Sequence, residues 1–141
     1  MILPSFAHKD KTTATLLAAA GGCIGLYRFY LGGKNDKAGW LHAISAPVSL
    51  LLHLINPDAP LLFVMAPLVI SAFTGIIAAL VIGTTSDEKW DALHNTHSQQ
   101  HSVSRWPLAL ILVLTLGIGA GALIATIART FDLLFTGGAY G

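Results

Sequence analysis

The chain contains four apolar stretches, and polar connections separate them. Two of these stretches, 61–83 and 106–128, contain no charged residue. At a rise of about 1.5 Å per residue, each can cross about 30 Å of hydrocarbon. The stretch 38–56 is shorter, and 12–31 reaches the required length only by including Arg28. The pattern predicts a transmembrane helix over each of the four ranges.

The connections predict how these helices pair. The segments 32–37 and 56–60 are short and rich in turn-forming Gly, Asn, Asp and Pro. Consecutive spans are therefore expected to lie antiparallel. The sequence predicts an all-α polytopic membrane protein of about four transmembrane helices in two antiparallel hairpins, with the first hairpin in 1–56 and the second in 57–141.

The polar connection 84–105 begins with the residue order of a capping box at Ser86, which predicts a short surface helix over 87–93. After the fourth span, the tail 129–141 is expected to lie in the membrane interface. Its apolar residues are Phe131, Leu133, Leu134 and Phe135.

Composition agrees with a bilayer environment. Hydrophobic residues make up 54% of the 141 residues and charged residues only 11%, which is unlike a soluble domain of this length. The net charge of +1 and the dispersed basic residues give no reason to expect a nucleic-acid partner. Cys23 is the only cysteine, so an internal disulfide and a cysteine-rich metal site are excluded.

Basic residues near the ends of the spans set the expected orientation, because they favour the cytoplasmic side. With four spans, both termini and 56–60 share one side with three basic residues, while 32–37 and 84–105 share the other with five. We therefore expect 32–37 and 84–105 in the cytoplasm of a bacterial inner membrane and both termini outside. The three are Lys9, Lys11 and Arg129, and the five are Arg28, Lys34, Lys37, Lys89 and Arg105.

The segment 9–23 has the charged and apolar parts of a secretory signal, and it ends in Gly-Gly-Cys. The leucine usual at a bacterial lipoprotein cleavage site is missing three residues before Cys23. We therefore expect this segment to remain in the mature chain.

One motif in the first hairpin resembles a known family. Residues 22–32 read Gly-x-x-Gly-x-x-Arg-Phe-Tyr-Leu-Gly, and Gly39 and a second apolar stretch follow. This pattern resembles the TM2 domain family over roughly Lys9 to Ser49. The resemblance implies two spans joined by a short cytoplasmic loop, and it implies no biochemical activity. In that family an aspartate or histidine begins the loop, whereas this chain has Tyr27 there.

The same motif has a physical interpretation. Small side chains in one helix allow a second helix to approach closely, and this is how helices associate in lipid. Arginine and aromatic side chains suit the boundary between lipid and water. The motif is therefore either a tightly built turn or a docking surface for a partner. The candidate interaction residues are Gly22, Gly25, Arg28, Phe29, Tyr30 and Gly32, and in the fourth span Gly117 and Gly121, which have G-x-x-x-G spacing.

Two histidines in the second span are candidate haem ligands. His42 and His53 are eleven residues apart, so they lie within about 20° of each other on a helix. A haem with two histidine ligands needs a facing histidine on another helix, and the other predicted spans contain none. We expect polar contacts for both residues and no cofactor within one chain. A haem shared with another subunit's histidine stays open.

The polar connection carries a second candidate cluster. Asp91, His94, His97 and His101 would lie along one side of a continuous helix, where they could bind zinc or another divalent ion. Serine, threonine and glutamine residues interleave with them, as in a solvated loop. We therefore expect no metal here.

No residue pattern in the chain indicates catalysis. There is no nucleophile with a plausible base, no phosphate-binding glycine loop and no metalloprotease motif. We expect a non-catalytic accessory or scaffold subunit that packs through small-residue helix faces against other membrane subunits. The alternatives are a small oligomeric channel or transporter, and a redox subunit that binds a cofactor through His42 or His53.

Overall fold

The computed structural model describes residues 8–140. Every regular element in that range is a helix, so the prediction of an all-α protein is confirmed for the described residues. The elements are α1 Lys11–Gly21, the 3₁₀ turn η1 Gly22–Ile24, α2 Leu26–Gly32, α3 Lys37–Ile55, α4 Leu61–Val64, α5 Ala66–Thr84, α6 Asp87–His94 and α7 Trp106–Phe135.

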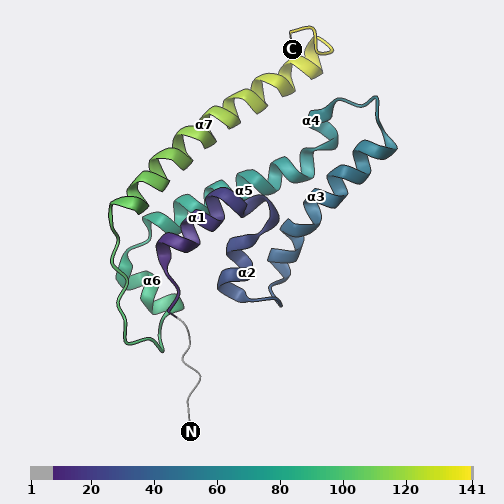
Figure 1. Ribbon diagram of the computed structural model, residues 1–141. Coiled ribbons are helices and arrows are strands. Elements are labelled where there is room, and N and C mark those ends of the chain that lie inside the picture. Colours follow the sequence, from purple (N-terminus) through teal and green to yellow (C-terminus); the bar gives the residue numbers. More distant parts are fainter. Residues whose placement is uncertain (1–7, 141) are drawn as a thin grey trace.

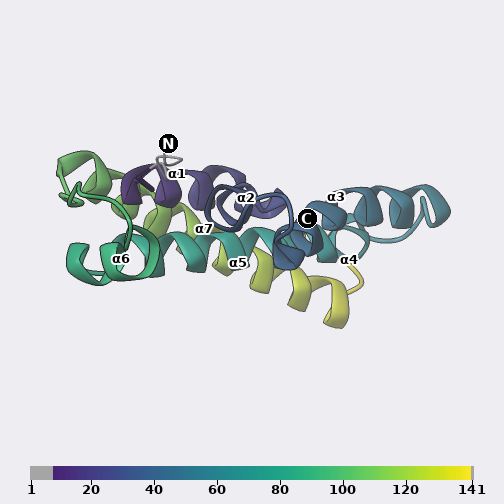
Figure 2. The ribbon, with the colours of Figure 1, turned by 90° about the horizontal axis from the view of Figure 1, so that it is seen from below.

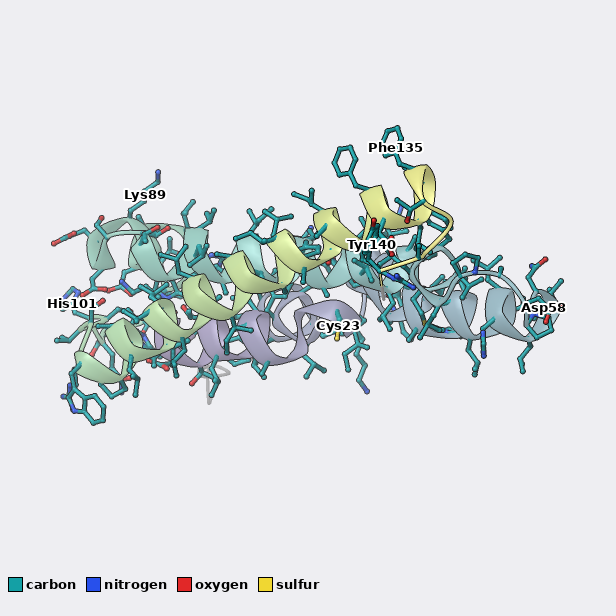
Figure 3. The ribbon with its side chains drawn as sticks, turned by 90° about the horizontal axis from the view of Figure 1, so that it is seen from above. Cys23, Asp58, Lys89, His101, Phe135 and Tyr140 are labelled. Carbon is teal, nitrogen blue, oxygen red and sulfur yellow. The ribbon has the colours of Figure 1, made fainter. Side chains whose placement is uncertain are left out.

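Helix α5 is the centre of the molecule. Figure 1 shows α1 and α3 following one another along α5, while α7 packs against α5 and α1. Viewed from below in Figure 2, α2 lies near the middle of the long axis. Figure 3 shows Lys89 and His101 near one end, Asp58 at the other, and Cys23 between them. We call these the α6 end and the α4 end.

Three helices are long and apolar enough to cross a membrane: α3, α5 and α7. They correspond to the second, third and fourth predicted spans, and their composition is consistent with an integral membrane protein. No fourth helix of this kind exists among residues 8–140. The predicted arrangement of four spans in two hairpins is therefore not confirmed.

Helix α1 covers only half of α5. Its 11 residues extend about 16 Å, whereas a crossing needs about 30 Å. Lys11 Nζ donates to the Thr85 carbonyl, 2.8 Å away, just beyond the C-terminal end of α5. The helix then ends where Gly22 contacts Gly75 in the middle of α5. The prediction of one continuous helix over 12–31 is therefore wrong, and a membrane crossing by this segment is not confirmed.

The chain turns back at Gly25, which the sequence pattern did not reveal. Gly25 has φ of 76°, in the left-handed region that favours glycine. An added Cβ there would lie 2.7 Å from the Gly39 carbonyl oxygen and 2.9 Å from the Cβ of His42. Only glycine fits this backbone angle and this close contact with α3. Helix α2 begins directly after it.

The two ends of the α1–α2 unit meet. Lys9 Nζ donates to the Tyr30 carbonyl at 3.0 Å and also to the Leu31 carbonyl at the end of α2. The backbone N–H of Asp10 donates to the Tyr30 hydroxyl at 2.9 Å. The chain therefore enters and leaves this unit at neighbouring points, which is the geometry of a hairpin that turns at η1.

Small residues at every fourth position let α1 and α5 approach closely. Ala14 and Ala18 of α1 are fully buried, and Gly22 continues their line. A methyl group on Gly22 would overlap the Cα atom of Gly75. Small residues with this spacing are the usual contact between helices in lipid. The matching positions on α5 are Ser71, Gly75, Ala79 and Gly83, all buried.

Helix α3 packs on the other half of α5 and caps its start. The buried Ser49 hydroxyl accepts the backbone N–H of Leu68 at 3.1 Å. This N–H lies in the first turn of α5, where no partner exists within the helix. Because unpaired backbone groups are costly in an apolar environment, the cap stabilises the paired helices.

Helix α7 is longer than the sequence predicted. It continues without a break from Trp106 to Phe135, about 45 Å for its 30 residues. Residues 129–135 therefore continue the helix, and the location of residues 129–141 in the membrane interface stays a prediction. Arg129 pairs with Asp132 one turn later, and this pairing neutralises the charge on the last turns of the helix.

We expect Gly75→Leu to lower the free energy of unfolding in detergent by about 3 kcal/mol, because the added side chain would separate α5 from η1. Thermal unfolding followed by circular dichroism measures this. Gly117→Leu is the matched control, because its Cβ would meet nothing within 4 Å. Equal stability of the two variants would contradict the close glycine contact.

Candidate functional site

The break between α1 and α2 leaves backbone groups unpaired in the apolar middle of the molecule. Side-chain hydroxyls from two other helices satisfy one of them, the Cys23 carbonyl. Ser71 Oγ of α5 donates to it at 2.7 Å, and Ser45 Oγ of α3 lies 3.1 Å away. Irregular backbone at membrane depth is tolerated where other protein groups satisfy it in this way.

His42 belongs to the same polar cluster. Its Nδ1 atom lies 2.6 Å from Ser71 Oγ, and the ring of Tyr27 packs edge-on against the imidazole at 5.9 Å between ring centroids. His42, Ser71 and the Cys23 carbonyl thus form a chain of short polar contacts that joins α3, α5 and η1. This cluster is the main polar feature between the apolar helices.

A groove of about 420 Å³ opens beside the cluster, between α3 and α5. This volume lies within the usual range for small-molecule sites, and a mostly apolar lining with a few convergent polar groups is typical of them. His42, Ser45 and Ser71 supply the polar groups from the cluster, and Thr74 adds a hydroxyl. The apolar lining residues are Leu41, Ile44, Val48, Pro67 and Ile70.

The arginine and aromatic residues of the motif contact other parts of the same hairpin. Arg28 Nε lies 3.7 Å from Asp36 Oδ1, and the guanidinium lies 6.0 Å from the centroid of the Tyr27 ring. Phe29 packs edge-on against Trp40 at 5.4 Å and covers Gly39. These contacts favour the interpretation of a tightly built turn.

The other motif residues act in the same way. The Tyr30 hydroxyl accepts the N–H of Asp10, as described above. A Cβ on Gly32 would lie 2.5 Å from a carboxylate oxygen of Asp36, which caps the start of α3. Gly22 and Gly25 make the close contacts with α5 and α3. A role of the whole motif as a docking surface for a partner stays a prediction.

A polar layer at the α6 end ties the N-terminal segment to the later connection. The backbone of Lys9 makes three hydrogen bonds: its N–H donates to Asn95 Oδ1 at 2.7 Å, and its carbonyl accepts from Trp90 Nε1 and Asn95 Nδ2. Lys11, almost fully buried, forms an ion pair with Asp87. Hydrogen bonds from Lys11 and Ser104 outweigh the effect of burial and lower the pKa of Asp87.

The predicted short helix over 87–93 is confirmed as α6, with the Ser86 hydroxyl accepting the N–H of Lys89 at 3.3 Å. The helix ends at His94, so His97 and His101 lie in the loop that follows it. The continuous helix that would align the candidate metal ligands does not form.

Asp91 has partners that leave little room for a metal ion. Its oxygens accept from Asn95 Nδ2 at 2.8 Å and from the N–H and hydroxyl of Ser102 at 2.7 and 2.6 Å. His94 packs against Trp90, and burial lowers the pKa of its imidazole. His101 Nδ1 lies 3.9 Å from Asp91 Oδ2. The described residues contain no group of three acidic, histidine or cysteine side chains placed to hold a metal.

The two histidines of α3 have different surroundings. His42 contacts Ser71, whereas the Nδ1 atom of His53 is buried and has no hydrogen-bond partner among the described residues. Helices α5 and α7 contain no histidine, so neither residue faces a second histidine ligand from these helices.

The glycines of α7 point in different directions. Gly119 packs on α5, where a Cβ would lie 2.8 Å from the side chain of Ile76. Added Cβ atoms at Gly117 and Gly121 would meet nothing within 4 Å. The pair with G-x-x-x-G spacing therefore makes no close contact within the chain.

Sequence reasoning missed the polar cluster around the helix break. Ser45 and Ser71 look like ordinary small residues in apolar helices until the break brings the Cys23 carbonyl between them. The available signal was the set of three glycines within the five residues 21–25, in a predicted span that was already short. That run was interpreted as a packing face alone.

Comparison of the chain with family models, with curated proteins and with solved structures gave no match.

We expect the polar layer to loosen only in strong acid. The hydrogen bonds from Asn95 and Ser102 lower the pKa of Asp91 to about 2, from the ordinary 3.8. The folded state therefore favours the ionised carboxylate. This stabilising contribution is complete above about pH 4 and is lost as the pH falls toward 2.

Fluorescence of the buried Trp90, in a chain whose Trp40 and Trp106 are replaced by Phe, reports this change. The emission should stay constant down to about pH 4 and shift to longer wavelength below it. In Asp91→Asn, the shift of the Trp90 emission below about pH 4 should lose most of its amplitude. A midpoint at or above the ordinary carboxyl pKa would contradict the assignment.

Proposed function

We propose that the protein is a non-catalytic subunit of a larger membrane assembly and that it packs against its partner through the outward face of α7. The observation that carries this proposal is the contrast between Gly119, which packs on Ile76, and Gly117 and Gly121, which meet nothing. At about 100° per residue, Gly117 and Gly121 share one side of the helix. Gly119 lies on the opposite side.

Outward glycines have a cost that the isolated chain does not recover. Glycine within a helix is less favourable than alanine by about 1 kcal/mol. A lipid-facing position needs no close approach, so either glycine could be alanine or leucine if lipid were its neighbour. Close contact with another helix recovers the cost, because glycine lets two backbones approach in lipid.

The second half of α7 supports the same proposal. From 120 to 128 only Thr126 is partly covered by the rest of the chain, and every other residue is exposed. Just before this segment, Val113 and Ile118 are also exposed by more than two thirds, at 68% and 69%. The apolar helix is therefore free on most sides to contact a partner or lipid.

We also propose that α1, η1 and α2 form a re-entrant hairpin and that α3, α5 and α7 are the three crossings. The support is the short α1, the turn at mid-height of α5, and the contact of Lys9 with the end of α2. The hairpin then enters and leaves the bilayer on one side. Residues 8–11 and the connections 33–36 and 85–105 all lie on that side.

This topology changes the number of basic residues on each side of the membrane. In the proposed topology, seven of the eight basic residues fall on the side of the α6 end, and only Arg129 falls on the other side. The bias places the α6 end in the cytoplasm of a bacterial inner membrane. Residues 8–11 are then cytoplasmic, and residues 136–140 are outside. The proposed orientation replaces the four-span orientation, in which both termini lay outside.

Purification of the tagged protein from native membrane in mild detergent tests the assembly proposal. We expect a stoichiometric partner, identified by mass spectrometry. Gly117→Leu and Gly121→Leu should each reduce its recovery at least about tenfold, because an added side chain blocks close helix contact.

Ala122→Leu is the matched control, because Ala122 is also exposed on α7 but lies about 100° or more from the two glycines. It should leave recovery of the partner unchanged. Recovery of the same chain as a monomer, or equal recovery with all three variants, would contradict the proposal.

A further inference from the structure

The groove between α3 and α5 has one hydrogen-bonding group that the fold does not use. His42 lines the groove, and its imidazole is only partly buried. Nδ1 contacts Ser71. The other ring nitrogen, Nε2, has no hydrogen-bond partner among residues 8–140. What a ligand could offer this atom depends on whether Nε2 carries a proton.

The contacts of Ser71 decide the position of that proton. Ser71 Oγ lies 2.7 Å from the Cys23 carbonyl, and a carbonyl can only accept, so the serine hydroxyl donates to it. A hydroxyl has one proton to give. For the 2.6 Å contact between Ser71 Oγ and His42 Nδ1 to be a hydrogen bond as well, Nδ1 must carry the proton and donate.

Nε2 is then a bare acceptor. An apolar environment favours the neutral imidazole, which has one protonated and one unprotonated nitrogen. With the proton on Nδ1, Nε2 presents a lone pair. Neither Ser45 nor Thr74 competes for it, because Ser45 Oγ lies 2.7 Å from the His42 carbonyl and Thr74 Oγ1 donates to the Ile70 carbonyl at 2.9 Å.

The rest of the groove favours an apolar molecule. Leu41, Ile44 and Val48 of α3 face Ile70 and Pro67 of α5 across it. Leu41 and Ile70 are 73% and 66% exposed, so the groove opens at its side toward the lipid. A ligand can therefore enter from the bilayer without passing through water.

We propose that this groove binds a lipid-soluble alcohol, whose hydroxyl donates a hydrogen bond to His42 Nε2 while its hydrocarbon part lies between α3 and α5. Ethers, esters and ketones of the same shape lack the donor and bind less tightly. Ser71 is a positioning residue, because it fixes the proton of His42 on Nδ1.

A pair of photoreactive probes tests the proposal in the full chain, reconstituted in phosphatidylcholine vesicles. One probe is a long-chain alcohol with a diazirine, and the other is its methyl ether. We expect the alcohol to label the groove residues about fivefold more than the ether, as one net hydrogen bond allows. Mass spectrometry of the labelled peptides from α3 and α5 measures the ratio.

Two substitutions of His42 distinguish the acceptor role of Nε2 from the contact of Nδ1 with Ser71. His42→Asn places an amide near the Nδ1 position, where it can still donate to Ser71, and it lacks a group at the Nε2 position. The preference for the alcohol should disappear. His42→Gln instead places an amide oxygen near the Nε2 position and should keep most of the preference.

Val48→Trp fills the groove without changing the polar cluster, so labelling by both probes should fall. Ser71→Ala removes the acceptor for the Nδ1 proton and should also abolish the preference for the alcohol, although Nε2 remains in place. Thermal unfolding identifies any variant that fails to fold. Only the folded variants are then compared in the labelling experiment.

Three outcomes would overturn the proposal. Equal labelling by alcohol and ether in the unmodified chain would show that no acceptor takes part. An unchanged preference in folded His42→Asn would exclude Nε2. A Soret band in the purified protein that His42→Asn removes would show that Nε2 binds a haem iron instead.

Discussion

The contact between Gly22 and Gly75 is the constraint on which the rest of the structure depends. It brings the end of α1 to the middle of α5, where the chain turns and the helix ends. A broken helix inside an apolar region leaves carbonyl groups that water cannot reach. The Ser71 hydroxyl of α5 donates to the Cys23 carbonyl at 2.7 Å, and Ser45 Oγ of α3 lies 3.1 Å from the same oxygen, so both helices line the turn.

The same turn connects the functional proposals. Because the chain returns at Gly25, the Lys9 ammonium reaches the Leu31 carbonyl near the end of α2, and this contact supports the proposal that the hairpin enters and leaves on one side. Because the Ser71 hydroxyl donates to the Cys23 carbonyl, His42 Nδ1 must donate to Ser71, and Nε2 keeps the lone pair that the proposed ligand would use. The outward glycines of α7 lie on a separate surface, so the proposed assembly and the proposed ligand binding can be tested independently.

The sequence predicted the elements whose pattern is local. Long apolar runs marked α3, α5 and α7, and the capping residue Ser86 marked the start of α6. The break at Gly25 was missed because glycines in an apolar segment fit a continuous, closely packed helix as well as a turn. The polar cluster was missed because His42 and Ser71 are far apart in the chain and meet only after that turn.

Labelling of single cysteines tests the re-entrant topology most directly. In sealed membranes of cells that carry Cys23→Ser, cysteines at His8, Lys34, Gln99, Asp58 and Thr136 would each be exposed to a membrane-impermeant thiol reagent. Positions 8, 34 and 99 should react only after the membrane is opened, and positions 58 and 136 in intact cells. Reaction of positions 8 and 34 from opposite sides would show that 12–31 crosses the bilayer, and it would contradict the account.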